Sequence, residues 1–232
     1  MKKAQTALVT LGLAGLVHCA SAQGLGSSFG LNPGATIPDG NPVGWMGQFN
    51  VTGTSGQVSG VQVTLDITGG YNGDLYAYLV SPQGQRAVLL NRPGISGTNP
   101  FGYGDSGLAV TFDMAAAKDV HSYGLSFALN SNGQVTGTWA ADGRDIDPQS
   151  DGHTFDSAPT TGGLNLLSGL AGADMNGAWT LFLADCAVGG GAATLQAVGM
   201  QISTVPEPSI ALQLVGSIFA WRLCRWHCRT RN

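Results

Sequence analysis

The amino-acid sequence predicts an all-β protein whose strands pack as a sandwich. Glycine supplies 36 of the 232 residues, about twice its ordinary share, and charged residues make up only 10% of the chain. Long amphipathic helices need many charged residues on their solvent-facing side, and this chain has few of them. Residues 58–67 instead alternate between apolar and polar, with the period of two that is typical of a half-buried strand.

The strands between residues 58 and 90 are the most clearly marked. After the alternating strand at 58–67, Tyr-Asn-Gly-Asp at 71–74 predicts a loop. Residues 75–80 are apolar on both faces, so they predict an internal strand. Ser-Pro-Gln-Gly at 81–84 has the composition of a type I turn, and residues 86–90 then return as a third strand.

Four further strands are expected, at residues 108–112, 136–140 (weakly marked), 178–184 and 194–203. Residues 126–170 are otherwise rich in Gly, Asp, Pro and Thr and predict long surface loops. Short strands separated by Gly, Asn and Asp indicate a sandwich. We expect one such domain over residues 37–204, preceded by a linker over residues 23–36.

The N-terminus predicts export. Lys2 and Lys3 precede an apolar stretch at residues 7–17, and Ala20-Ser21-Ala22 has the small residues of a cleavage site. Residues 1–22 therefore predict a secretory signal peptide.

The C-terminus, residues 205–232, combines three features in order. The prolines of Val205-Pro206-Glu207-Pro208 interrupt regular structure and predict an exposed spacer. An apolar run at residues 209–221 predicts a helix of roughly 20 Å, shorter than the membrane core of about 30 Å. A basic end follows, with arginines at positions 222, 225, 229 and 231 that favour the cytoplasmic side.

This tail resembles the PEP-CTERM sorting signal, whose parts occur here in the family's order. The resemblance implies transient membrane association, processing by an exosortase, and a Gram-negative source that makes exopolysaccharide. The alternative is an ordinary C-terminal membrane anchor.

Without its two ends the chain is strongly acidic. Residues 23–204 hold four basic residues and thirteen acidic ones, a formal net charge of −9, and all thirteen are aspartates. Such a surface repels nucleic-acid phosphates, so no nucleic-acid partner is expected. Aspartate suits turns, which explains its excess in a turn-rich β protein; the alternative is coordination of a hard cation such as calcium.

Four segments in order resemble the P domain, also called Homo B, of proprotein convertases and bacterial subtilases. These segments are residues 37–40 (Ile-Pro-Asp-Gly), 61–90 with Gly73-Asp74-Leu75 at its centre, 167–185 with Asn176-Gly177-Ala178-Trp179, and 195–202. The resemblance covers residues 30–204. It implies a jelly-roll-like sandwich that accompanies and stabilises a protease catalytic domain.

The candidate calcium ligands are Asp74, Asp105, Asp113 and Asp185. The chain departs from the family pattern at Gly69-Gly70 and at Gly189-Gly190-Gly191, and the second departure removes a ligand from any calcium site that used that turn. The densest run of acidic residues offers a second set of candidate calcium ligands: Asp142, Asp145, Asp147 and Asp151. This run lacks the residue spacing of an EF-hand, so the alternative interpretation is a solvated loop.

No catalytic residues are expected. After processing, His121 and His153 are the histidines that remain. Gly53-Thr54-Ser55 and Gly104-Asp105-Ser106-Gly107 look like the nucleophile segments of serine proteases, but neither has a histidine upstream in the mature chain. A serine protease needs an imidazole to take the proton of its nucleophile. Both motifs therefore predict loops.

The sequence thus favours a secreted or surface-displayed, non-enzymatic P-domain protein with a binding or structural role in the envelope or exopolysaccharide. One alternative is an accessory domain that acts in trans on a separate subtilisin-like protease. The other is a calcium-dependent carbohydrate-binding module.

Overall fold

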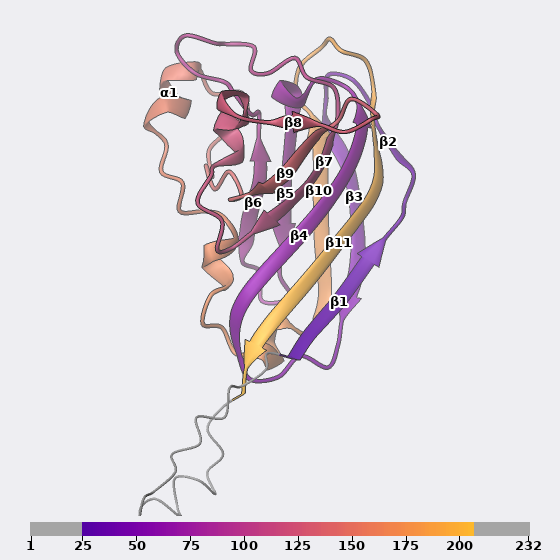
Figure 1. The fold of residues 1–232 in the computed structure, drawn as a ribbon, viewed down its shortest axis with the longest axis vertical. Helices are drawn as coiled ribbons and strands as arrows, with labels where there is room; N and C mark the ends of the chain where they lie inside the picture. The colour runs from indigo at the N-terminus through magenta and orange to yellow at the C-terminus, as the bar shows by residue number, and fades with distance from the viewer. Residues whose placement is uncertain (1–24, 207–232) are drawn as a thin grey trace, which may run out of the picture.

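The computed structural model describes residues 25–206, with only the backbone for residues 25–28. Two β-sheets pack face to face, and short helical turns fill the connections between them (Figure 1). The predicted all-β sandwich is confirmed. The expected signal peptide, Glu207, Pro208 and the C-terminal apolar helix lie outside the described residues.

The strands and helical segments follow one another along the chain as β1 (Leu25–Leu31), β2 (Ala35–Ile37), β3 (Asn41–Val51), β4 (Gln57–Gly69), η1 (Asn72–Asp74), β5 (Leu75–Val80), β6 (Arg86–Asn91), β7 (Leu108–Asp113), η2 (Val120–Leu125), β8 (Ala128–Leu129), β9 (Val135–Trp139), α1 (Gly152–Ser157), η3 (Leu164–Leu167), η4 (Gly172–Met175), β10 (Gly177–Asp185) and β11 (Ala193–Val205).

The larger sheet has the strand order β1-β11-β4-β7-β9-β8, and β2 also pairs with β11. Its long central pair, β4 and β11, runs antiparallel, whereas β7 and β9 run parallel. The alternation predicted in β4 is observed, because Val61, Val63 and Leu65 are buried while the residues between them are not. That face of the sheet forms one wall of the core.

The smaller sheet has the order β3-β10-β5-β6 and supplies the other wall. The indole of Trp179 in β10 is fully buried and donates a 2.9 Å hydrogen bond to the carbonyl of Met175. A large apolar ring can be buried this deeply because its one polar group finds a partner. Leu75 and Leu79 of β5 pack into the same core.

The N-terminal linker prediction is wrong for most of its length. Residues 25–31 form the edge strand β1, which pairs with β11, and Phe29 and Leu31 pack against the core. The glycines of this stretch hid the strand. Gly30, for example, lies so close to the sheet that a Cβ there would come within 3.1 Å of the Val198 carbonyl oxygen.

The prediction that residues 126–170 form surface loops also needs correction. Beyond β9, the connection to η3 at residues 140–163, here called the arm, folds back over β6 through the bonds Val88 N–Gly162 O (2.8 Å) and Asp142 N–Leu89 O (3.1 Å). Phe155 in its α1 helix is buried. Periodicity could not show this, because the arm is held by single contacts rather than by an apolar face.

The first strand of the sandwich begins at the same pole at which the last strand ends. Leu25 is paired with Thr204, so β1 begins where β11 ends, at the lower end of the view in Figure 1. Val205 and Pro206 are exposed there. Among residues 25–206, no helix has the length and apolar character needed to cross a bilayer.

Candidate functional site

Four charged residues gather at the opposite pole of the sandwich. Asp185 ends β10 and pairs with Leu75 of β5, which places it beside Asp74 of η1. Asp185 also pairs with Asn41 of β3, which brings in the turn that holds Asp39. Arg92 follows the last residue of β6. We call Asp39, Asp74, Asp185 and Arg92 the polar cluster.

Arg92 is the cation of the polar cluster and is 8% exposed. Its guanidinium donates to Asp74 Oδ1 (3.4 Å), to the Gly73 carbonyl (3.2 Å) and to the Pro148 carbonyl of the arm (3.3 Å). Its backbone has φ +48°, in the left-handed region that costs a residue with a Cβ about 1 kcal/mol. The three bonds hold it in this unfavourable conformation.

Asp185 is fully buried but only half satisfied. Its Oδ1 accepts hydrogen bonds from the backbone amides of Gly40 (3.2 Å) and Ala187 (3.3 Å), whereas Oδ2 has no partner among the described residues. The neighbouring Asp39 accepts a bond from Gly189 N at 2.9 Å. A buried carboxylate oxygen without a donor is energetically costly.

Two carboxyl groups of the polar cluster, those of Asp74 and Asp185, have raised pKa values. Burial raises the pKa of Asp74 to about 6, and the charge of Asp185 adds to this rise while Arg92 opposes it. Burial likewise raises the pKa of Asp185, against the lowering effect of the two amides. One arginine therefore does not offset the negative charge gathered here.

Of the first set of predicted calcium ligands, the structure brings Asp74 and Asp185 together and leaves the others elsewhere. Asp105 accepts a hydrogen bond from the Tyr123 hydroxyl at 3.1 Å. Asp113 lies at the far end of β7, where Gln62 donates to it at 2.8 Å. Asp39 was missed, although the turn Ile-Pro-Asp-Gly that holds it was noted.

The second predicted set is dispersed along the arm. Asp142 is fully buried, Asp145 pairs with Arg86 on the surface, and Asp147 accepts the amide of Gln149 at 2.9 Å. Asp151 caps α1 by accepting the Thr154 amide, which lowers its pKa. In residues 25–206 no three His, Cys, Asp or Glu side chains form a ready metal cage.

His121 forms a buried ionic group that the sequence did not indicate. Its Nδ1 lies 2.8 Å from Asp142 Oδ2 and its Nε2 lies 2.9 Å from the Ile95 carbonyl. Arg144 binds Asp142 at 3.0 Å and Asp119 at 2.8 Å. Both ring nitrogens are thus engaged by oxygens, and neither is free to take a proton from a serine such as Ser106.

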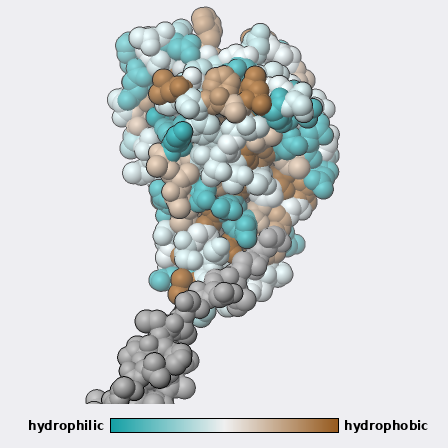
Figure 2. Space-filling model, viewed as in Figure 1, coloured by the Kyte–Doolittle hydropathy of each residue, from teal (hydrophilic) through white to brown (hydrophobic). Residues whose placement is uncertain are grey.

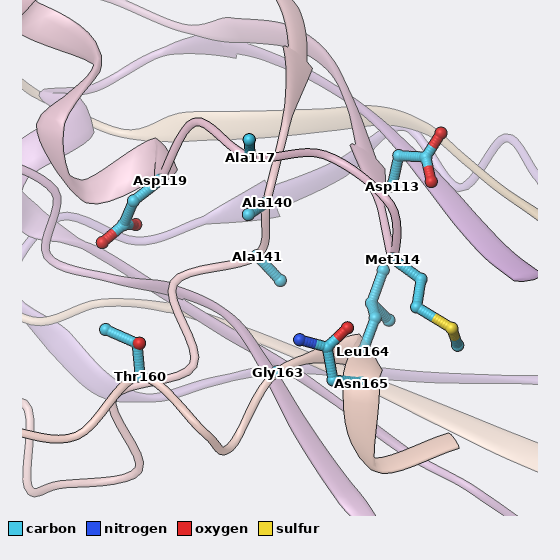
Figure 3. A pocket seen from close by; sticks show the side chains of 10 residues that line it. All are labelled: Asp113, Met114, Ala117, Asp119, Ala140, Ala141, Thr160, Gly163, Leu164 and Asn165. Atoms are coloured by element: carbon cyan, nitrogen blue, oxygen red, sulfur yellow. The ribbon is translucent and has the colours of Figure 1, made fainter. Parts of the chain in front are cut away.

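A hollow of about 150 Å³ lies where the β7–η2 connection, the end of β9 and the arm meet (Figure 3). Alanines 117, 140 and 141 line its centre, and Asp113 and Asp119 stand at its sides. Both carboxylates already accept bonds from Gln62 and Arg144 respectively. The two carboxylates beside the hollow are therefore already engaged within the protein.

Arg92→Ala is expected to destabilise the protein by about 3–5 kcal/mol, because Asp74 then keeps a buried charge without its cation. Arg92→Gly should cost roughly 1 kcal/mol less than Arg92→Ala, since glycine accepts the positive φ. Urea unfolding measures both free energies. Arg86→Ala is the control: its ion pair with Asp145 is exposed, and its loss should cost less than about 1 kcal/mol. Equal effects at positions 86 and 92 would contradict the prediction.

Comparison with known proteins gives a family match for part of the chain. Residues 58–157 match the family model described as the proprotein convertase P-domain. A search of curated proteins found no match. Two solved structures are similar: the serine protease of Aeromonas sobria (16% identity, TM-score 0.40) and its complex with a chaperone (15%, 0.40). They cover 78% and 79% of this chain, which spans only 27% of the length of either protease chain. The family match supports the predicted resemblance to the P domain over residues 58–157, from β4 to the end of α1.

Proposed function

We propose that this chain is an exported, non-enzymatic P-domain protein that is displayed at the cell surface or in the exopolysaccharide and acts by binding. The observation that carries the proposal is the placement of the two poles. The first residue of β1, Leu25, and the last residue of β11, Val205, lie at one pole of the sandwich, and the polar cluster lies at the other. A domain tethered at its lower pole would hold the polar cluster away from the tether.

The pole of the cluster also exposes apolar side chains. Val188, next to the Asp39 turn, is 87% exposed, and Phe101, next to η1, is 82% exposed. Figure 2 shows brown, apolar residues near the upper end of the visible face, away from the end of β11. Exposed apolar side chains at the pole away from the tether suit recognition of a partner.

The sorting tail supplies the delivery step of the proposal. Val205 is the last residue of β11 and pairs with Gln57, and both Val205 and Pro206 are exposed, so the motif begins where the sandwich ends. An exosortase would act there while the apolar run and its arginines hold the chain in the membrane. This step rests on the motif at residues 205–208 and its resemblance to the PEP-CTERM signal.

Intact-mass measurement of secreted and membrane fractions tests delivery. In a host with an exosortase, the secreted protein is expected to lack residues 1–22 and the basic end, whereas a Pro206→Ala/Glu207→Ala double variant should keep Arg231 and stay in the membrane. Val188→Ala, exposed and outside the motif, is the control and should be processed normally. Secreted protein that still carries Arg231 would contradict processing.

We further propose that the polar cluster binds calcium. The partnerless Oδ2 of buried Asp185 fits a cation, and Asp74 and Asp39 add negative charge around it. Calcium combines carboxylates with backbone carbonyls. Because no ready three-carboxylate cage is described, Asp74 and Asp185 would bind the ion together with such carbonyls.

Calcium is expected to raise the melting temperature, and Asp185→Asn, which keeps the shape but removes the charge, should abolish the rise. Asp113→Asn, outside the cluster, should leave it unchanged. The effect should weaken below about pH 6, where Asp74 takes up its proton and cannot bind the ion. Scanning calorimetry with calcium and with a chelator measures this; a flat response at pH 8 would overturn the proposal.

A second candidate function is favoured by the family match at residues 58–157. The chain would then act in trans as the accessory domain of a separate subtilisin-like protease. When the purified protein is mixed with such a protease from the same cells, the melting temperature of the protease should rise. No association at micromolar concentration, by analytical ultracentrifugation, would count against this candidate and leave the display proposal standing.

A further inference from the structure

We propose that His121 is a proton-dependent latch that fastens the arm to the sandwich. The ring connects three segments that are distant in sequence. It contacts Asp142 at the start of the arm, stacks on Phe155 of α1 at a centroid distance of 5.6 Å, and reaches the Ile95 carbonyl in the β6–β7 connection. Its own carbonyl accepts the Gly94 amide at 2.9 Å. The inference is independent of the proposed function.

The latch requires the ring to carry two protons. Both partners of the ring nitrogens, the Asp142 carboxylate and the Ile95 carbonyl, are acceptors. Asp142 already accepts bonds from the Asn91 amide (3.2 Å) and from Arg144, so the proton it shares with His121 belongs on the ring. A neutral imidazole has one N–H and can satisfy only one of its two partners.

The surrounding charges favour that proton. The charged groups near the ring are Asp142 and Arg144 of the arm, of which Asp142 favours the proton and Arg144 opposes it, and the β6–β7 connection contributes the Ile95 carbonyl. Asp119, at the start of η2, binds the backbone amide of His121 and the Arg144 guanidinium. Burial alone would lower the pKa of His121, but the hydrogen bond and charge of Asp142 outweigh it and raise the pKa. With the ring charged, two cations and two carboxylates balance in the buried group.

Loss of the proton should loosen the arm. A raised folded-state pKa means that the stabilisation is complete below the unfolded value of about 6.5 and is lost as the pH rises through the folded value. Above it, either Ile95 or Asp142 loses its donor. The arm then opens more often and uncovers the edge of β6, which it reaches through Val88 and Leu89.

Two measurements on the purified protein test the latch. Long-range proton–nitrogen spectra of the histidine rings should show both nitrogens of His121 protonated at pH 6.5, with a pKa above that value. Hydrogen exchange, corrected for intrinsic rates, should show the amides of Asp142, Gly143 and Gly162 opening roughly tenfold more per pH unit between about pH 6.5 and the folded pKa.

The matched variants are His121→Gln and His153→Gln. The first should remove the pH dependence of arm opening, and the second, at an exposed position in α1, should keep it. A neutral His121 ring at pH 6, or equal pH dependence in wild type and His121→Gln, would overturn the proposal. If His121→Gln does not fold, the ring spectra of the wild type decide the question.

Discussion

The buried guanidinium of Arg92 is the interaction on which the upper pole of the sandwich depends. It joins the end of β6 to the η1 turn and to the arm through three different acceptors. A buried cation is tolerated only when its donors are matched, and a left-handed backbone adds to its cost. The compensation comes from Asp74, Gly73 and Pro148 together, so none of the three segments can move without leaving a buried donor unsatisfied.

Most of the few basic residues in the body of the chain hold the arm in place. Residues 23–204 contain four of them, and three take part in holding the arm. Arg86 binds Asp145 and Arg92 binds the Pro148 carbonyl from outside the arm, whereas Arg144 belongs to the arm and binds Asp119. Nearly all the positive charge of the body is therefore engaged in fixing one connection. Other carboxylates accept hydrogen bonds from neutral groups instead, as Asp105 does from the Tyr123 hydroxyl and Asp113 from the Gln62 side chain.

The sequence predicted the strands that carry a regular pattern and missed those that do not. Residues 75–80 were predicted with the observed bounds of β5, because a short apolar run between turns has one simple interpretation. β3 was missed because Gly44, at φ +62°, and Gly47 interrupt its alternation. Of the site, Asp74 and Asp185 were named, but their proximity follows from the register of β5 and β10, which composition does not reveal. The pairing of His121 with Asp142 depends on the path of the arm and has no local signal.

The arm links two charged groups that lie far apart in the sequence. At one point it presents Asp142 to His121, and six residues later the Pro148 carbonyl accepts a bond from Arg92. If the arm loosens at Asp142, Arg92 loses an acceptor and its guanidinium becomes freer to shift toward the partnerless oxygen of Asp185. A cation bound between Asp74 and Asp185 would oppose that shift by repelling the guanidinium. Because Asp142 and Pro148 belong to the same connection, the arm offers a physical route by which loss of the His121 proton would act on the polar cluster.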